Sequence, residues 1–276
     1  MKRRLEAIAV NVMACAVSLA FLYPFWWMAV ASFRSQQAIL SDPLRPWPES
    51  FDLSGFASLA RIGGVSIWVF ARNSVVYSAA ATILGVTIMA LGAYALHRRR
   101  GSPIFEIVRY GFLVKIMYPS MLLVIPLYFV VHRFGLLGSP IGIVIVMCAM
   151  PLVFFLFMEF FAAVPDEIVD AARVDGAGEF RILTRIVMPM ARPVVLTAVL
   201  IAFLLAWKQW FPVMVLSTGP DTYTLPIALI SLNSELGVEF QAIMALATLT
   251  VLPVAVLFVL TQRRVMDGFL SGGVKG

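Results

Sequence analysis

Six stretches of about 20 residues in this 276-residue chain are almost free of charged side chains. A helix needs about 20 mostly apolar residues to cross the hydrocarbon core of a bilayer. Because lipid cannot hydrogen-bond the backbone, each stretch is predicted to be a helix. The predicted spans are residues 7–31, 73–96, 110–131, 140–161, 193–216 and 242–261. We therefore expect an all-α, polytopic membrane protein with six transmembrane helices that forms a single domain, residues 1–276.

The composition excludes an ordinary soluble protein. Hydrophobic residues make up 61% of the chain and charged residues 13%, whereas soluble domains average about 45–50% and about 25%. A net charge of +6 would suggest nucleic acid as a partner of a soluble protein. Here the basic residues lie in short loops between apolar runs, so we expect a lipid bilayer and no nucleic acid as the partner.

The distribution of basic residues predicts the orientation. Fourteen of the 21 Lys and Arg residues lie at the termini and in one set of alternate loops, and five lie in the other set. The side richer in Lys and Arg is cytoplasmic in membrane proteins. Both termini are therefore predicted to be cytoplasmic. The outer segment 32–72 is expected to carry short interfacial structure and no separate domain.

The inner segment 164–192 is too polar to cross the membrane, yet its apolar residues recur at helical spacing. This pattern predicts two short amphipathic helices that meet near Gly176 and Gly178. Small side chains on the first helix would let its backbone approach a partner closely. The pattern alone also fits a helix that lies on the membrane surface.

The order of residues in this segment resembles a known signature. It follows the spacing EAA-x3-G-x9-I-x-L-P of ATP-binding-cassette importer permeases, with Asp170 in place of Glu and Met188 in place of Leu. The stretches AYALHRR and IPLYF are similar to the maltose-type branch, whose members import carbohydrates. The resemblance extends over nearly the whole chain and implies the type I importer permease fold, with 164–192 as a cytoplasmic coupling helix pair.

The resemblance also implies a role and a set of partners. The chain would be a permease subunit in a bacterial cell membrane and would translocate a carbohydrate or related solute. Its partners would be a second homologous permease, an ATPase dimer on the cytoplasmic side and an external solute-binding protein. The residues that would contact the ATPase are Asp170, Ala171, Ala172, Asp175, Gly176, Ile186 and Pro189.

The chain is not expected to be an enzyme or to bind a cofactor. It contains no G-x-x-x-x-G-K-[ST] motif, so ATP and Mg should be bound by the separate ATPase. No catalytic residue and no metal site are expected, because the acidic cluster between Asp166 and Glu179 has no His or Cys near it. A secondary transporter or channel working without an ATPase is the alternative function. It would predict inverted repeats or several charged residues within the spans, and neither is evident.

Two lysines lie within the predicted spans. Lys115 is near the cytoplasmic end of its span, and we expect it to extend to that interface. Lys208 lies toward the outer half of the fifth span, about 22 Å from the inner end at about 1.5 Å per residue. It either extends outward or lines a substrate cavity with Trp207, Gln209 and Trp210, where an ammonium group would favour acidic solutes. The family usually has Trp-Asn where this chain has Trp207-Lys208, so disaccharide, oligosaccharide, polyol and glycerophosphate-type solutes all remain open.

Overall fold

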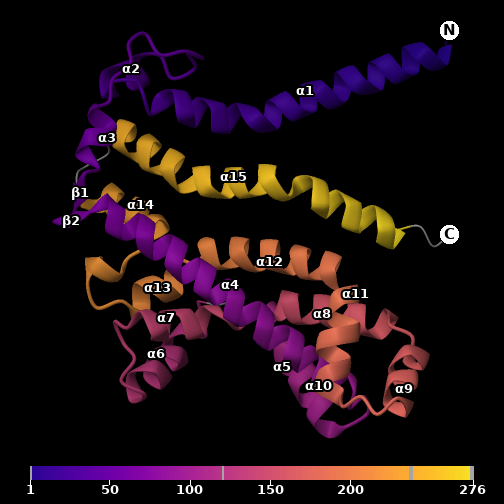
Figure 1. The fold of residues 1–276 in the computed structure, drawn as a ribbon. Coiled ribbons are helices and arrows are strands. Elements are labelled where there is room, and N and C mark those ends of the chain that lie inside the picture. The colour runs from indigo at the N-terminus through magenta and orange to yellow at the C-terminus, as the bar shows by residue number, and fades with distance from the viewer. Residues whose placement is uncertain (1, 120, 236–238, 274–276) are drawn as a thin grey trace. The chain divides into compact units, whose positions relative to one another are not determined.

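The computed structural model describes residues 2–119, 121–235 and 239–273, most of which are helical (Figure 1). The longer helices are α1 (Lys2–Ala31), α4 (Ile67–His97), α5 (Pro103–Met117), α6 (Val124–Arg133), α7 (Pro140–Met147), α8 (Pro151–Ala163), α9 (Asp166–Val174), α12 (Arg192–Trp207), α14 (Leu225–Glu235) and α15 (Phe240–Gly273). The short helical elements are α2 (Gln36–Ser41), α3 (Ser54–Ser58), α10 (Glu179–Ile182), the π-helical turn η1 (Leu183–Val187), α11 (Met188–Met190), α13 (Phe211–Leu216) and the 3₁₀ turn η2 (Pro220–Thr222). Two strands, β1 (Arg61–Ile62) and β2 (Val65–Ser66), pair as an antiparallel hairpin.

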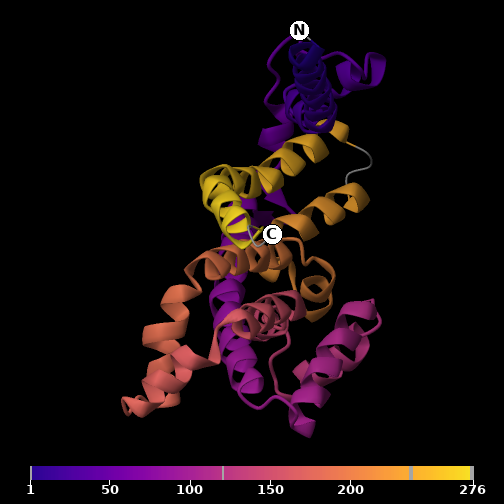
Figure 2. The same ribbon diagram turned by 90° about the vertical axis from the view of Figure 1, so that its right-hand side faces the viewer.

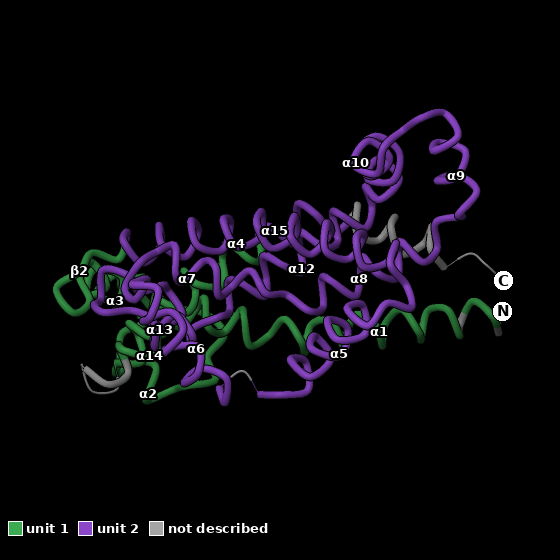
Figure 3. Tube along the Cα trace, turned by 90° about the horizontal axis from the view of Figure 1, so that it is seen from below, with its two compact units in different colours: residues 1–67, 228–255 green, residues 68–227, 256–276 purple. Residues whose placement is uncertain are grey.

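The chain divides into two compact units (Figure 3). Unit 1 consists of residues 1–67 and 228–255, and unit 2 consists of residues 68–227 and 256–276. Unit 2 contains residues 164–192, called the coupling segment below after the role that the resemblance implies, and the residues predicted to line the substrate cavity.

Three helices in the described part of the chain are long and apolar enough to cross a membrane: Glu6–Ala31, Ile67–His97 and Phe240–Gln262. Two bent helix pairs also qualify, α7 with α8 at 45° and Glu179–Met190 with α12 at 83°, so the number rises to five if each pair is one span. These helices confirm a multi-pass membrane protein.

The predicted third span, residues 110–131, is divided between α5 and α6. Helix α5 ends at Met117, and its C-cap Tyr118 is extended, with φ −83° and ψ 130°. Tyr118 precedes Pro119, whose ring disfavours a helical conformation of the residue before it. The predicted fifth span is interrupted in a similar way between Trp207 and Phe211.

Unit 1 contains residues 32–67 of the outer segment, which form α2, α3 and the hairpin. The buried side chain of Arg34 donates hydrogen bonds to the carbonyl oxygens of Ala38 (2.7 Å) and Asp42 (2.8 Å) at the end of α2. The Ser54 backbone amide donates to the Asp52 carboxylate at 2.8 Å and lowers the pKa of Asp52. Ser54 Oγ also donates to Gln241 at 3.0 Å, which ties α3 to the start of α15.

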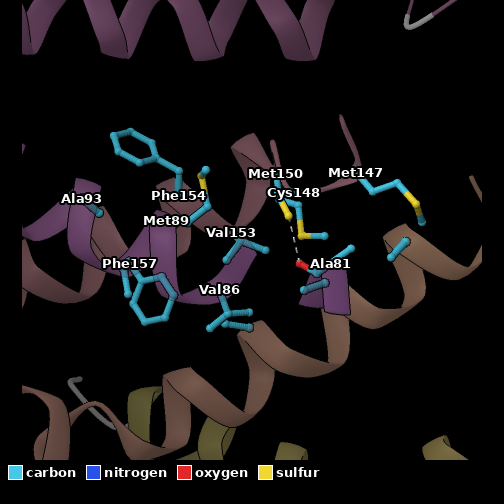
Figure 4. Close-up of a cluster of buried hydrophobic side chains, with 14 of the residues drawn as sticks. Ala81, Val86, Met89, Ala93, Met147, Cys148, Met150, Val153, Phe154 and Phe157 are labelled. Carbon is cyan, nitrogen blue, oxygen red and sulfur yellow. Dashed lines mark hydrogen bonds between the residues drawn. The ribbon is translucent and has the colours of Figure 1, made fainter. Parts of the chain in front are cut away.

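Unit 2 is built around α4. Its buried face packs on α7 and α8, where the thiol of Cys148 donates to the carbonyl of Ala81 at 3.8 Å (Figure 4). Gly85 permits this close approach, because a Cβ at that position would lie 3.1 Å from both the Cys148 carbonyl oxygen and the Met150 sulfur. Helix α4 is therefore in direct contact with the break between α7 and α8.

Candidate functional site

The coupling segment, residues 164–192, projects from one side of unit 2 as α9, α10, η1 and α11 (Figure 2). Helix α9 ends in a Schellman motif: the Gly176 amide donates to Arg173 and the Ala177 amide donates to Ala172, both at 2.9 Å. Gly176 has φ +79°, a backbone conformation that residues other than glycine adopt only with strain. The glycine of the signature therefore ends α9 and turns the chain toward α10.

The two faces of the coupling segment differ. One face is buried on unit 2 through Val169, Ala172, Ile182, Leu183 and Val187. Two large apolar side chains outside this face are exposed: Val174 is 88% exposed and Phe180 is 74% exposed. Both side chains are available to a protein partner or a membrane surface.

Glu179 links this segment to α4. Its Oε2 accepts a hydrogen bond of 2.9 Å from the Tyr94 hydroxyl, and its Oε1 accepts two from the Arg173 guanidinium. The hydrogen bonds from Arg173 lower the pKa of the Glu179 carboxyl. A second connection joins Arg98, just after α4, to Asp166 at the start of α9, with 3.3 Å between Nη1 and Oδ1. The coupling segment is thus held to the end of α4 at both α9 and α10.

The residues predicted to contact the ATPase all lie on this segment, but they do not share one face. Asp170, Ala171, Asp175, Gly176 and Pro189 are exposed, Ile186 is half-buried and Ala172 is buried. Sequence reasoning did not find Tyr94 and Arg98 as partners of the segment, or Glu179 as its link to α4. The AYALHRR stretch contains the first two, and this was the signal available.

A cavity of about 890 Å³ lies within unit 2. Of the four predicted cavity residues, Lys208, Gln209 and Trp210 line it. Trp207 is buried and stacks on Phe203, with ring centroids 5.5 Å apart. The other lining residues come mainly from the ends of α5 and α7, from α6 and from the starts of α8 and α13.

Both lysines of the predicted spans line this cavity. Lys115 donates a hydrogen bond to the carbonyl of Ala149, in the break between α7 and α8. Lys208 lies in the break between α12 and α13. Pro212, four residues later, has no N–H to bond the Lys208 carbonyl, which favours this break. The cavity therefore combines an apolar wall with two cationic groups at two helix breaks.

The comparisons with known proteins agree with these features. Residues 87–268 match the family described as binding-protein-dependent transport system inner membrane component. The permease protein DasC of the diacetylchitobiose uptake system of Streptomyces coelicolor is 28% identical over 270 residues, with 96% of each chain covered. The inner membrane ABC transporter permease protein YcjP of Escherichia coli is 28% identical over 277 residues, which cover 100% of this chain and 99% of that one.

The fold has a solved counterpart. The structure of a bacterial ABC transporter involved in the import of the acidic polysaccharide alginate includes a chain that matches with a TM-score of 0.80 at 21% identity. The match covers 95% of this chain and 97% of that one. This identity is low, so the likeness shows the fold only. Because the family match covers more than half of the sequence, the chain belongs to the binding-protein-dependent inner membrane permeases and is a transport subunit of an ATP-binding-cassette importer, not an enzyme.

Proposed function

We propose that this chain translocates a carbohydrate or related solute, which an external solute-binding protein delivers, through the cavity in unit 2. The names of its relatives support this substrate class, since they include permeases for diacetylchitobiose and for arabinooligosaccharides. We propose six spans, with α5 and α6 together forming the third and both termini in the cytoplasm of a bacterium. A second homologous permease would complete the pathway, because importers of this kind have two permease subunits.

The coupling segment would be the contact with the ATPase dimer. The observation that carries this proposal is that three apolar residues of the segment, Ala171, Val174 and Phe180, are exposed. The segment is attached to the end of α4 through Glu179 and Asp166. A movement of the ATPase would therefore reach a membrane helix directly.

ATP and Mg would be bound by the ATPase, and ATP hydrolysis would supply the energy. This chain would transmit the movement of the coupling segment along α4 to the break between α7 and α8. The carbonyl of Ala149 lies in that break and accepts from Lys115 of the cavity. The contacts thus form a continuous path from the coupling segment to the cavity wall.

The test is a charge placed on the exposed face. Val174→Asp should leave the packing of unit 2 unchanged, because Val174 is 88% exposed, and should abolish copurification of the ATPase and ATP-dependent uptake. Leu44→Asp is the matched control, since Leu44 is 76% exposed but lies in the outer segment. Retention of the ATPase and of uptake by Val174→Asp would contradict the proposal.

A further inference from the structure

We propose that the cavity binds the anionic group of an acidic carbohydrate, with the ammonium groups of Lys115 and Lys208 as its counter-charges. The inference rests on the proposed function and narrows its substrate class. The anionic group would be a carboxylate, sulfonate or phosphate, all of which accept charge-assisted hydrogen bonds from lysine.

The charge of the cavity wall is the first argument. Lys115 and Lys208 are the only ionisable side chains among the described residues that line the cavity, and Gln209 and Trp210 supply its other polar side-chain groups. All the remaining lining residues are apolar or glycine. A solute in this cavity would therefore meet two positive charges and no negative one.

The lysines have no counter-charge within the described part of the chain. Every ion pair there uses an arginine, and none of these arginines lines the cavity. Lys115 is half-buried and donates to the carbonyl of Ala149, while its ammonium group has three protons to donate. One carbonyl does not neutralise an ammonium group, and an uncompensated charge in an apolar setting is costly. A bound anion would remove this cost at Lys115 and would pair the exposed ammonium group of Lys208.

The ammonium group of Lys115 does not lie where that of an interfacial anchor would. The sequence suggested that it extends to the cytoplasmic surface, but its Nζ instead bonds a carbonyl in a helix break that belongs to the cavity wall. The ring of Trp210 and the amide of Gln209 line the same space. An aromatic face can pack on a sugar ring while the ammonium groups bind its acidic substituent. The wall thus suits a solute that is both a carbohydrate and an anion.

The first experiment measures the charge preference of the cavity without knowledge of the solute. In the assembled importer, Cys15→Ser and Cys148→Ala remove the native thiols, and Val146→Cys places a reporter thiol in the wall. The reaction rate of this reporter thiol is measured with two methanethiosulfonate reagents, an anionic sulfonated one and a cationic trimethylammonium one, and the two rates are expressed as a ratio. The anionic reagent should react faster, and Lys115→Gln and Lys208→Gln should each lower the rate ratio several-fold.

Arg133→Gln is the matched control for the loss of one positive charge. Arg133 is exposed and does not line the cavity, so the ratio should stay unchanged. If neither Lys115→Gln nor Lys208→Gln changes the ratio of reaction rates, the proposal is overturned. The proposal is also overturned if, in the unaltered importer, the two reagents react equally fast or the cationic reagent reacts faster, the result expected if a second permease supplies carboxylates to the lysines.

The second experiment identifies the natural solute. Mass spectrometry of the ligand that copurifies with the solute-binding protein should detect a sugar with a carboxylate, sulfonate or phosphate group. Lys208→Gln should weaken its apparent transport affinity about tenfold, in the range for hydrogen bonds to charged groups, and Lys208→Arg should restore most of it. A neutral sugar with normal ATP-dependent uptake would overturn this inference and leave the proposed function intact. Absence of ATP-dependent uptake in the unaltered importer would instead contradict the proposed function.

Discussion

The hydroxyl of Tyr94 near the end of α4 donates a hydrogen bond of 2.9 Å to the Glu179 carboxylate at the start of α10. Because Glu179 also accepts from Arg173 of α9, one carboxylate holds both helices of the coupling segment and the membrane helix together. The opposite end of α4 is fixed as well, since Asn73 donates to the carbonyls of Asp221 and Tyr223. Helix α4 therefore has polar attachments near both ends.

Tyr94→Phe removes only the hydroxyl of this connection. The loss of one hydrogen bond should lower the free energy of unfolding by about 0.5–1.5 kcal/mol and should reduce the amount of solute transported per ATP hydrolysed. Transport and ATPase rates of the reconstituted importer give this ratio. Tyr128→Phe is the control, because Tyr128 is on α6 and its ring stacks on His132. An unchanged ratio for Tyr94→Phe would show that the bond plays no part in coupling.

Gly176 and Gly178 allow a second test within the coupling segment. Neither would bring an added Cβ within 4 Å of another residue, but Gly176 has φ +79° and Gly178 has φ −73°. Gly176→Ala should cost about 1–3 kcal/mol in backbone strain and impair ATPase retention, while Gly178→Ala should be nearly silent. Both variants should insert normally in the membrane. Equal retention of the ATPase by both would contradict the role of the left-handed turn.

Gly85 tests the contact between α4 and the break between α7 and α8. In Gly85→Ala the new methyl group would lie 3.1 Å from the carbonyl oxygen of Cys148, which belongs to the backbone and cannot easily move. We expect destabilisation by about 1–3 kcal/mol, the usual effect of overpacking, together with slower uptake. Gly92→Ala is the control on the same helix, because no other residue lies within 4 Å of its Cβ position. Thermal unfolding in detergent should separate the two variants, and identical curves would argue against the tight contact.

The sequence was sufficient for the features that depend on local chemistry. Apolar runs predicted helices long enough to cross a membrane, of which the described residues contain three to five, and the glycine of the signature marked the place where α9 ends. Contacts between residues far apart in the chain could not be predicted. Lys115 and Ala149 are 34 residues apart and Tyr94 and Glu179 are 85 apart, so their pairing depends on how the helices pack. Pro212 is a helix breaker within the run 193–216, but a proline alone does not show whether a helix bends or is interrupted, so the break after Trp207 could not be located from the sequence.

Asn73 provides the last prediction, at the other end of α4. Its buried Nδ2 donates to the Asp221 carbonyl at 2.7 Å and to the Tyr223 carbonyl at 3.0 Å. Asn73→Ala leaves both acceptors unpaired and should cost about 1–3 kcal/mol. Asn73→Asp should be worse although its shape is unchanged, because a carboxylate would face two carbonyl oxygens, and the neighbouring Arg72 offsets this only in part. Thermal unfolding and proteolysis of the loop around Pro220 should show that the unaltered protein is the most stable, Asn73→Ala is less stable and Asn73→Asp is the least stable. If Asp is as stable as Asn, the amide does not act as the double donor that fixes this loop.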